Sequence, residues 1–169
     1  MRTLGAVLAG GRSSRFGSDK AQALLAGETL IDHALRAIAP HCDEVAVVGR
    51  VHAPVRSLWD WPSAGLGPLA GLAGALRWAV ENGFDQVLTI PVDCAVVPTD
   101  LRRILEPAPA VLDSQPVLGL WQASVAGELM AVLRDGSDRS VRAFARRIGA
   151  RSVAGFDPPN VNTPADLAV

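Results

Sequence analysis

A short apolar run that ends on two glycines constrains the fold of this chain more than any other feature. Residues 3–9 (TLGAVLA) are apolar throughout most of their length and predict a strand that is buried on both faces. Gly10 and Gly11 follow directly, and the next residues, RSSRFGSDK, are too charged for a protein core. A buried strand that leads into a glycine turn is typical of α/β proteins, where such turns lie at one edge of a parallel sheet.

The rest of the chain alternates short apolar runs with segments of helix length, which predicts an α/β fold with a mainly parallel sheet. Further strands are expected at residues 44–49, 55–59, 86–92, 117–121 and 151–154. Helices are expected at residues 30–39, 67–82, 100–105, 127–133 and 139–148. With 169 residues, of which 49% are hydrophobic, we expect a single domain with a sizeable core.

Composition excludes several classes of function. The net charge of −1 argues against nonspecific nucleic-acid binding, which needs a basic field. The apolar runs are all shorter than the roughly 20 residues that cross a membrane, so we expect no membrane association. Cys42 and Cys94 do not form a disulfide framework, which favours the cytoplasm. The three histidines (His33, His41 and His52) lack the spacing of metal ligands.

The glycine turn has the composition of an anion site. Successive backbone N–H groups in such a turn can surround a phosphate, and glycine leaves room for the phosphate to approach. Lys20, at the end of this segment, is the only lysine among 16 lysine and arginine residues. The segment matches neither the G-x-x-x-x-G-K-[ST] loop nor the G-x-G-x-x-G dinucleotide motif. The alternative is a plain glycine-rich connection with solvated charges.

Asp93 follows the expected strand at residues 86–92, where the chain must turn. Ligands of open α/β sheets bind outside the carboxyl ends of the strands, so Asp93 is expected at the same edge as the glycine turn. A carboxylate beside a polyphosphate site can hold Mg²⁺, which takes one or two protein carboxylates and completes its shell with phosphate oxygens and water. The alternative is a helix cap or a turn aspartate.

Taken together, five segments resemble the molybdenum cofactor guanylyltransferase family. They are LAGGRSSRFGSDKA (8–21), GPLAGL (67–72), PVDCAVVP (91–98), RSVRAF (139–144) and NVNTPADL (160–167). The segments stand in the family's order and span most of the chain. Gly11, Asp19 and the GPLAGL segment favour the guanylyl branch over relatives that use other nucleotides. The resemblance implies a Rossmann-like, three-layer α/β/α nucleotidyltransferase fold.

The resemblance also implies a reaction, in which the terminal phosphate of molybdenum-carrying molybdopterin attacks the α-phosphorus of GTP. A guanine dinucleotide cofactor forms and pyrophosphate leaves. The implied nucleotide-binding and catalytic residues are the backbone of Leu8, Ala9, Gly10 and Gly11, Lys20 at the α-phosphate, Arg15 on the pyrophosphate side and Asp93 as the Mg²⁺ ligand. A general base is not required, because the attacking phosphate is already ionised at neutral pH.

Asp60 matches a family position that accepts hydrogen bonds from guanine N1–H and the exocyclic amine. The alternative is an exposed turn aspartate between two tryptophans. The family often has Asn near the end of the second strand, where this chain has Gly49 followed by Arg50. Gly49 lacks an amide side chain, so that contact to the base is not carried over, and whether Arg50 replaces it stays open.

The resemblance assigns residues 1–100 to the nucleotide and residues 101–169 to the pterin acceptor. Arg139 is expected to bind the acceptor phosphate, and Asn160 and Asn162 to line the pterin pocket. If residues 139–148 are helical, Arg139 shares one face with two further arginines, at positions 142 and 146, which is also the pattern of a solvated surface. The asparagines are equally common in turns. The segment at 106–116 is shorter than in the family, so its contacts are not carried over.

The sequence is therefore consistent with three functions. The first is GTP-dependent guanylyl transfer with Mg²⁺, with GTP and molybdopterin as substrates. The second is a related nucleotidyltransferase that uses CTP or another phosphorylated acceptor. The third is a nucleotide-binding module without catalysis, such as a cofactor chaperone. The family further implies transient contact with a cofactor-supplying insertase and with recipient molybdoenzymes.

Overall fold

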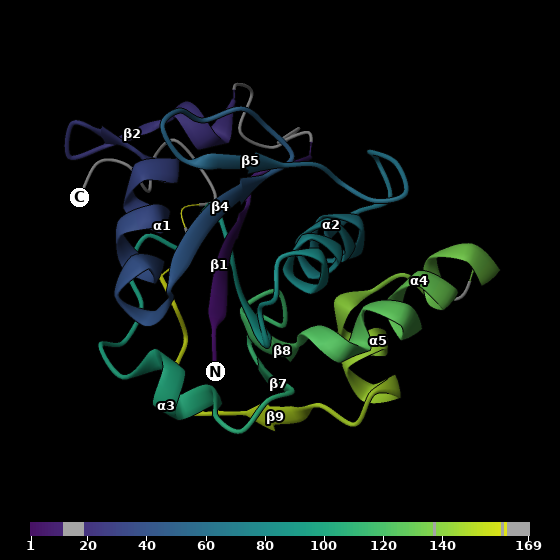
Figure 1. Cartoon of the computed structure of the whole chain (residues 1–169). Helices are drawn as coiled ribbons and strands as arrows, with labels where there is room; N and C mark the ends of the chain where they lie inside the picture. The colour runs from purple at the N-terminus through teal and green to yellow at the C-terminus, as the bar shows by residue number, and fades with distance from the viewer. Residues whose placement is uncertain (12–18, 137, 160, 162–169) are drawn as a thin grey trace.

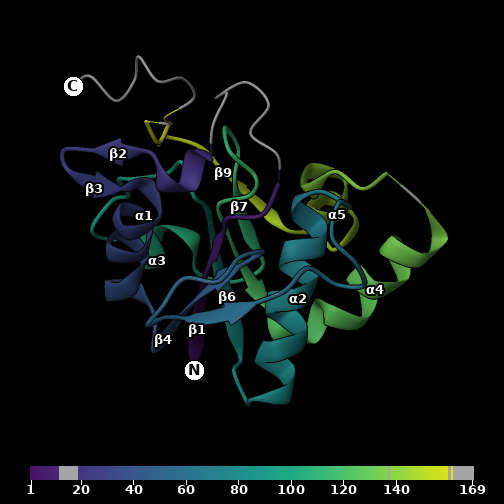
Figure 2. The same cartoon turned by 90° about the horizontal axis from the view of Figure 1, so that it is seen from above.

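The protein is a three-layer α/β/α sandwich. The computed structural model describes residues 1–11, 19–136, 138–159 and 161. One face of the sheet is covered by α1 (Leu30–Ile38) and α3 (Leu101–Leu105), and the other by α2 (Pro68–Glu81), α4 (Ala126–Asp135) and α5 (Val141–Arg147), as Figure 1 and Figure 2 show. The expected fold class is confirmed.

The central sheet has seven strands in the order β5-β4-β1-β6-β8-β7-β9. Their bounds are β1 (Thr3–Leu8), β4 (Glu44–Val48), β5 (Arg56–Leu58), β6 (Gln86–Pro91), β7 (Ala110–Leu112), β8 (Gly119–Gln122) and β9 (Arg151–Val153). In this sheet β8 is antiparallel to both its neighbours, β6 and β7, and every other pairing is parallel. Six strands therefore end at the same edge of the sheet, which we call the carboxyl edge.

Burial on both faces explains why β1 has no polar face. Leu4 and Ala6 pack in the core under α2, whereas Val7 and Ala9 pack in the core under α1. All four side chains are buried, as expected for a central strand covered by helices on both sides. The chain connects β1 to β4 on one side, and β6 pairs on the other side of β1. The glycine turn after β1 consequently lies at a switch point of the sheet, where ligands bind in such folds.

The helix boundaries follow ordinary capping chemistry. Thr29 is the N-cap of α1, and its side chain accepts a hydrogen bond from the Asp32 N–H. Helix α2 begins at Pro68, a residue suited to the first turn, and ends before Gly83, whose φ of +70° favours glycine. Ser140 caps α5 by accepting from the Ala143 N–H. No helix in the described ranges is long and apolar enough to cross a membrane.

The expected elements are present within one or two residues at each end, and three strands were missed. The strand β7 has only three residues and lies between EPAP and DSQP, so its proline-rich surroundings resemble a loop. The short hairpin of β2 (Leu24–Leu25) and β3 (Glu28–Thr29) is separate from the main sheet. Short 3₁₀ segments complete the described structure: η1 (Lys20–Gln22), η2 (Ala39–His41) and η3 (Ala123–Val125).

Candidate active site

The residues expected to bind phosphate lie at the carboxyl edge of β1. The Ala9 N–H donates to the Val48 carbonyl over 2.9 Å, so β1 and β4 stay paired up to the first glycine. Leu8 lies inside β1 itself. Gly10 and Gly11 are exposed beyond the end of the strand, and the φ of Gly11 is +108°. Of the four backbone amides expected to surround the nucleotide, the Ala9 amide is already used by β4, which leaves the two glycines best suited to that role.

Lys20 and Asp93 meet across the sheet edge. Lys20 Nζ lies 2.8 Å from Asp93 Oδ2, and the two side chains are only 16% and 17% exposed. Asp93 Oδ1 is buried and has no hydrogen-bond partner among the residues that the structure describes. An unsatisfied, buried carboxylate oxygen is costly, so this geometry suits a site that takes up a further ligand.

The neighbour of Asp93 does not compete for that ligand. Burial, together with the charge of Asp93, raises the pKa of the Cys94 thiol to about 12, so the thiol stays protonated. A cluster of three or more histidine, cysteine or carboxylate side chains is absent from the described part of the chain. A single carboxylate beside a phosphate site is the ligand set that Mg²⁺ uses, since substrate oxygens and water fill the remaining positions.

Asp60 is held against α2 and faces the glycine turn. The Trp61 N–H donates to the Ala70 carbonyl over 2.9 Å, which fixes the chain beside Asp60 to the first turn of α2. A Cβ atom placed on Gly10 or on Gly71 would lie 3.5 Å from Asp60 Oδ1. Burial raises the pKa of the Asp60 carboxyl above its ordinary value of 3.8. The carboxylate is therefore half-buried between two glycines from different segments.

The glycine spacing of α2 explains how Asp60 comes so close to the helix. Gly71 and Gly74 stand three residues apart, so they share one face of α2. A Cβ on Gly74 would lie 2.0 Å from the Trp59 carbonyl oxygen, which only glycine allows. This role of the helix glycines was not predicted. The recurrence of glycine at residues 67, 71 and 74 is the signal that could have revealed it.

A cleft of about 310 Å³ extends from Asp60 along the groove between β5 and α2. Its walls carry aromatic and charged side chains, and two arginines stack on tryptophans: Arg56 on Trp78 and Arg77 on Trp61. Asp60 is thus not an isolated surface aspartate, because it borders both the glycine turn and this cleft.

Gly49 approaches the glycine turn so closely that a side chain has no room. Its φ is +91°, and a Cβ there would lie 2.5 Å from Gly10 Cα and 2.7 Å from Gly10 N. The position at which the family often has asparagine is therefore a site of backbone-to-backbone contact between Gly49, just after β4, and the glycine turn.

We expect Gly49→Ala to destabilise the fold by more than about 1 kcal/mol, because both the positive φ and the contact with Gly10 oppose a Cβ. It should also weaken GTP binding through displacement of Gly10. Thermal unfolding and GTP titration measure the two effects. Gly127→Ala is the matched control: a Cβ there meets nothing within 4 Å and its position in α4 tolerates alanine. Equal stabilities of the two variants would contradict the steric account.

Of the residues predicted to bind the acceptor, Arg139 is described by the structure, but it does not lie in a helix. Arg139 precedes Ser140, the N-cap of α5, so the expectation that it shares a helical face with Arg142 and Arg146 is wrong. Its guanidinium lies 3.5 Å from the Leu133 carbonyl oxygen instead. Arg142 bonds to Asp113, over 3.2 Å to the carboxylate and 2.7 Å to the carbonyl.

Arg15, Asn160 and Asn162 lie outside the described residues. Val161, between the two asparagines, is buried, and its N–H donates to the Asp93 carbonyl over 3.2 Å. This contact places Val161 beside the loop that carries Asp93, and the sequence offered no signal for it beyond the resemblance.

Residues 5–152 match the protein family described as MobA-like NTP transferase domain. The chain belongs to this family. The resemblance drawn from the five segments is confirmed, and this member of the MobA-like family is a nucleotidyltransferase. Nucleotidyltransferases of this family generally act with a divalent metal ion.

Curated relatives of this MobA-like protein cover nearly all of it. A protein of Acidiphilium cryptum (strain JF-5), named molybdenum cofactor guanylyltransferase, is 36% identical over 178 residues, covering 95% of this chain and 90% of the relative. A protein of the same name from Cereibacter sphaeroides is 37% identical over 190 residues, with 99% and 95% covered. The solved structure of molybdopterin-guanine dinucleotide biosynthesis protein A from Archaeoglobus fulgidus superposes with a TM-score of 0.74 at 24% identity, covering 98% of this chain and 95% of that one.

Proposed function

We propose that this protein transfers GMP from GTP to the terminal phosphate of molybdenum-carrying molybdopterin, which forms a guanine dinucleotide cofactor and releases pyrophosphate. The observation that carries the proposal is the Lys20–Asp93 pair beside the glycine turn, in a chain whose close relatives are named for this reaction. The same names favour GTP over the CTP alternative. A catalytically inert binding module would not need a largely buried lysine paired with a carboxylate whose second oxygen has no donor among the described residues.

In the proposed reaction, an oxygen of the pterin phosphate forms a bond to the α-phosphorus as the bond to the β-phosphate oxygen breaks. Such a transfer depends on positioning and on neutralising charge, because little covalent chemistry is left to the protein. Gly10 and Gly11 bind the triphosphate through backbone amides, and Lys20 turns from Asp93 to the α-phosphate. Arg15 neutralises charge on the departing pyrophosphate.

Asp93 is the proposed ligand of Mg²⁺. Its buried Oδ1 fits the role, since a hard oxygen ligand that has no donor among the described residues can bind a hard cation. When bound, the ion supplies Lewis-acid polarisation of the phosphate oxygens and orients the triphosphate. When Lys20 leaves Asp93, its ammonium group becomes available to the phosphate and the Asp93 carboxylate becomes available to the metal ion. Lys20 stays within the site, where it is a second positive charge beside the ion.

The acceptor side rests on the C-terminal part of the chain. We assign residues 1–100 to nucleotide binding and residues 101–169 to the acceptor, with Arg139 for its phosphate and Asn160 and Asn162 for the pterin. The contact of Val161 with the Asp93 loop supports this assignment, because it holds the intervening residue beside the reaction centre. Transient docking of an insertase and of recipient molybdoenzymes, and a location in the cytoplasm, complete the proposal.

Nucleotide preference tests the proposed function. Calorimetric titration of GTP, CTP, ATP and UTP with Mg²⁺ should give selective binding of GTP to the wild-type protein. Preference for CTP would instead support the second candidate function, a nucleotidyltransferase that uses CTP. Equal binding of all four nucleotides would overturn the assignment of a guanine site at Asp60.

Asp60→Asn is expected to reduce the preference for GTP over ATP by about 10- to 100-fold, since hydrogen bonds to a charged group contribute about 1.5–3 kcal/mol. One carboxylate accepts from both N1–H and the amine of guanine, a pair of donors that adenine lacks. Asp85→Asn is the matched control, because Asp85 bonds to the Arg2 N–H at the opposite edge of the sheet. A GTP preference that survives in Asp60→Asn would place guanine elsewhere.

The same site predicts a pH dependence. Burial raises the pKa of Asp60, so its carboxyl takes up a proton at a higher pH than an ordinary aspartate. Only the ionised form accepts both guanine donors, so the GTP preference should be complete at neutral pH and should fall as the pH drops through the raised pKa. The raised pKa also affects stability. Burial of the ionised Asp60 carboxylate lowers the free energy of unfolding at neutral pH, and this cost disappears when the carboxyl is protonated.

A further inference from the structure

Asp19 and Lys20, which follow the glycine turn, make ion pairs in opposite directions. Asp19 Oδ2 lies 2.7 Å from Arg50 Nη1, and Lys20 Nζ lies 2.8 Å from Asp93 Oδ2. Arg50 follows β4, whereas Asp93 follows β6, and β1 lies between these two strands. The Asp19–Lys20 dipeptide is therefore fastened on both sides of the strand that leads into the glycine turn.

Arg50 binds one residue before the two glycines and one residue after them. Its Nε donates to the Ala9 carbonyl over 3.1 Å, and its Nη1 donates to Asp19. Ala9 stands immediately before the glycines, and Asp19 is the N-cap of η1, the short turn that carries Lys20. The Arg50 hydrogen bond holds the pKa of the Asp19 carboxyl below its usual value. A planar guanidinium can serve two acceptors at once, whereas a lysine ammonium is a point charge on a flexible stem.

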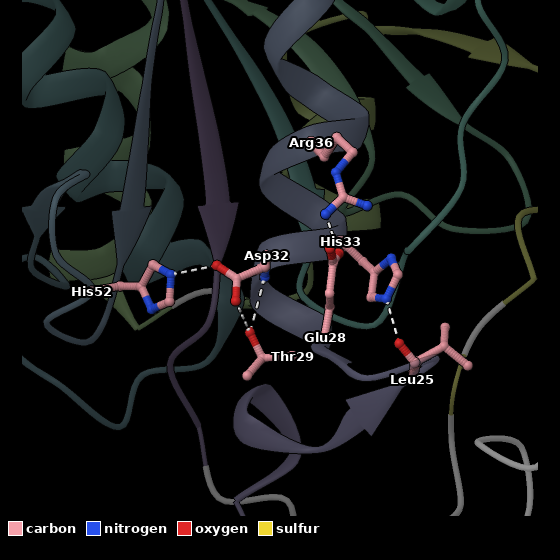
Figure 3. Close-up of polar contacts among 7 residues, drawn as sticks. All are labelled: Leu25, Glu28, Thr29, Asp32, His33, Arg36 and His52. Atoms are coloured by element: carbon pink, nitrogen blue, oxygen red, sulfur yellow. Dashed lines mark hydrogen bonds and ion pairs between the residues drawn. The ribbon is translucent and has the colours of Figure 1, made fainter.

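The backbone that carries Arg50 is itself held in place. The Gly49 N–H donates to the Leu58 carbonyl over 2.9 Å. His52 Nε2 lies 2.8 Å from Asp32 Oδ1 near the start of α1, a contact drawn in Figure 3. The His52 N–H also donates to Ser57 Oγ over 3.3 Å. Arg50 thus extends from a segment that is attached to β5 and to α1, so it can act as a fixed support.

Lys20 needs such a support during catalysis. The Lys20–Asp93 pair cannot hold the lysine while it serves a phosphate, because a lysine turned toward the phosphate has left Asp93. The Asp19–Arg50 contact is made by the residue just before Lys20 and does not involve the lysine side chain. It can therefore keep the Lys20 backbone in place in both states.

We propose that Arg50 is a positioning residue for Lys20: it binds both Ala9 and Asp19 and so keeps Lys20 within reach of the α-phosphate. The kinetic part of this inference rests on the proposed function. In that reaction a misplaced Lys20 lowers the rate of transfer more than it lowers GTP affinity, since the lysine acts most strongly on charge that develops in the transition state.

The single lysine makes a direct test possible. Protein labelled with ¹⁵N-lysine gives one backbone amide signal, that of Lys20. We expect Arg50→Ala and Asp19→Asn to shift this signal in the same direction, and Arg103→Ala to leave it unchanged. Arg103 is the matched control because it pairs with Asp100 on the exposed side of α3. Arg50→Lys, a milder change that keeps the charge, should give an intermediate shift.

Kinetics supply the second readout. Arg50→Ala should lower kcat by about 10- to 100-fold, with KM for GTP within about threefold, because small misplacements of a catalytic group have effects of this size. Arg50→Lys should recover part of the loss. The double variant Arg50→Ala/Asp19→Asn should be no slower than the slower single variant, because each change breaks the same Arg50–Asp19 contact.

Three results would overturn the inference: an unchanged Lys20 signal in Arg50→Ala, additive losses in the double variant, or a raised KM with normal kcat. The last result would indicate that Arg50 contacts the nucleotide directly. If the wild-type protein makes no dinucleotide, the proposed function fails, whereas the amide signal still decides whether Arg50 positions Lys20.

Discussion

Lys20→Ala is expected to lower kcat for GMP transfer by about 100- to 1,000-fold, the usual effect of removing one preorganised donor to developing charge. Binding of GTP should weaken much less, because the triphosphate keeps its backbone contacts at Gly10 and Gly11. Single-turnover transfer and GTP titration measure the two quantities separately. The chain offers no second lysine that could take over the role.

Stability must be measured alongside activity, because Lys20→Ala also leaves the Asp93 carboxylate without its partner. Lys20→Arg keeps a positive charge beside Asp93 and serves as the folding control. We expect Lys20→Arg to unfold near the wild-type temperature and still to transfer GMP slowly, since a guanidinium differs from an ammonium in shape and reach. A Lys20→Ala protein that is folded and retains most of its kcat would contradict the assigned role.

Asp93→Asn is expected to have the second large effect. An amide cannot replace the charge of the proposed Mg²⁺ ligand, and loss of metal-ion catalysis amounts to several kcal/mol, or about 1,000-fold in kcat/KM. GTP binding by the variant should no longer depend on Mg²⁺. Titrations with and without the ion, on wild type and variant, measure that dependence.

Asp100→Asn is the control for this second experiment, since Asp100 lies seven residues further on and pairs with the exposed Arg103. Its GTP binding should depend on Mg²⁺ as in the wild type. If Asp93→Asn keeps both its activity and its metal dependence, the ion is held elsewhere and the unsatisfied Oδ1 of Asp93 has another explanation.

It was predictable that the segment carrying Lys20 and the loop carrying Asp93 lie at one edge of the sheet, although the direct contact between the two side chains, 73 residues apart, was not predicted. Each follows an apolar run with the pattern of a buried strand, and parallel strands bring their carboxyl ends to one edge. The prediction required neither the strand order nor the register. Local apolar patterns and one topological rule were sufficient for the fold class and for placing both segments at the same edge.

The surroundings of Asp60 could not be predicted in the same way. They depend on contacts between three segments that are remote in sequence: Gly10, Gly71 and the Trp59 carbonyl against Gly74. Apolar periodicity predicts α2, but it does not reveal how closely the backbone of another segment approaches the helix. The role of Arg50 was equally hidden, because its two acceptors are a backbone carbonyl and a carboxylate on the far side of the glycines.

Arg139 shows how a capping residue decides which side chains belong to a helix. The arginine spacing suggested one helical face, but the hydroxyl of Ser140 caps the chain one residue later and leaves Arg139 outside the helix. Strand β7 was missed for a different reason. Three apolar residues between prolines are too short to show a period, and pairing with β8 and β9 stabilises them as a strand.

The most direct test of the central claim is product formation from labelled nucleotides. The protein is incubated with molybdenum-carrying molybdopterin, Mg²⁺ and one of GTP, CTP, ATP or UTP labelled at the α-phosphate, and the labelled dinucleotide and released pyrophosphate are measured. We expect that GTP alone gives efficient transfer, with one pyrophosphate for each guanine dinucleotide formed. Faster transfer from CTP, or release of pyrophosphate without a dinucleotide product, would contradict it.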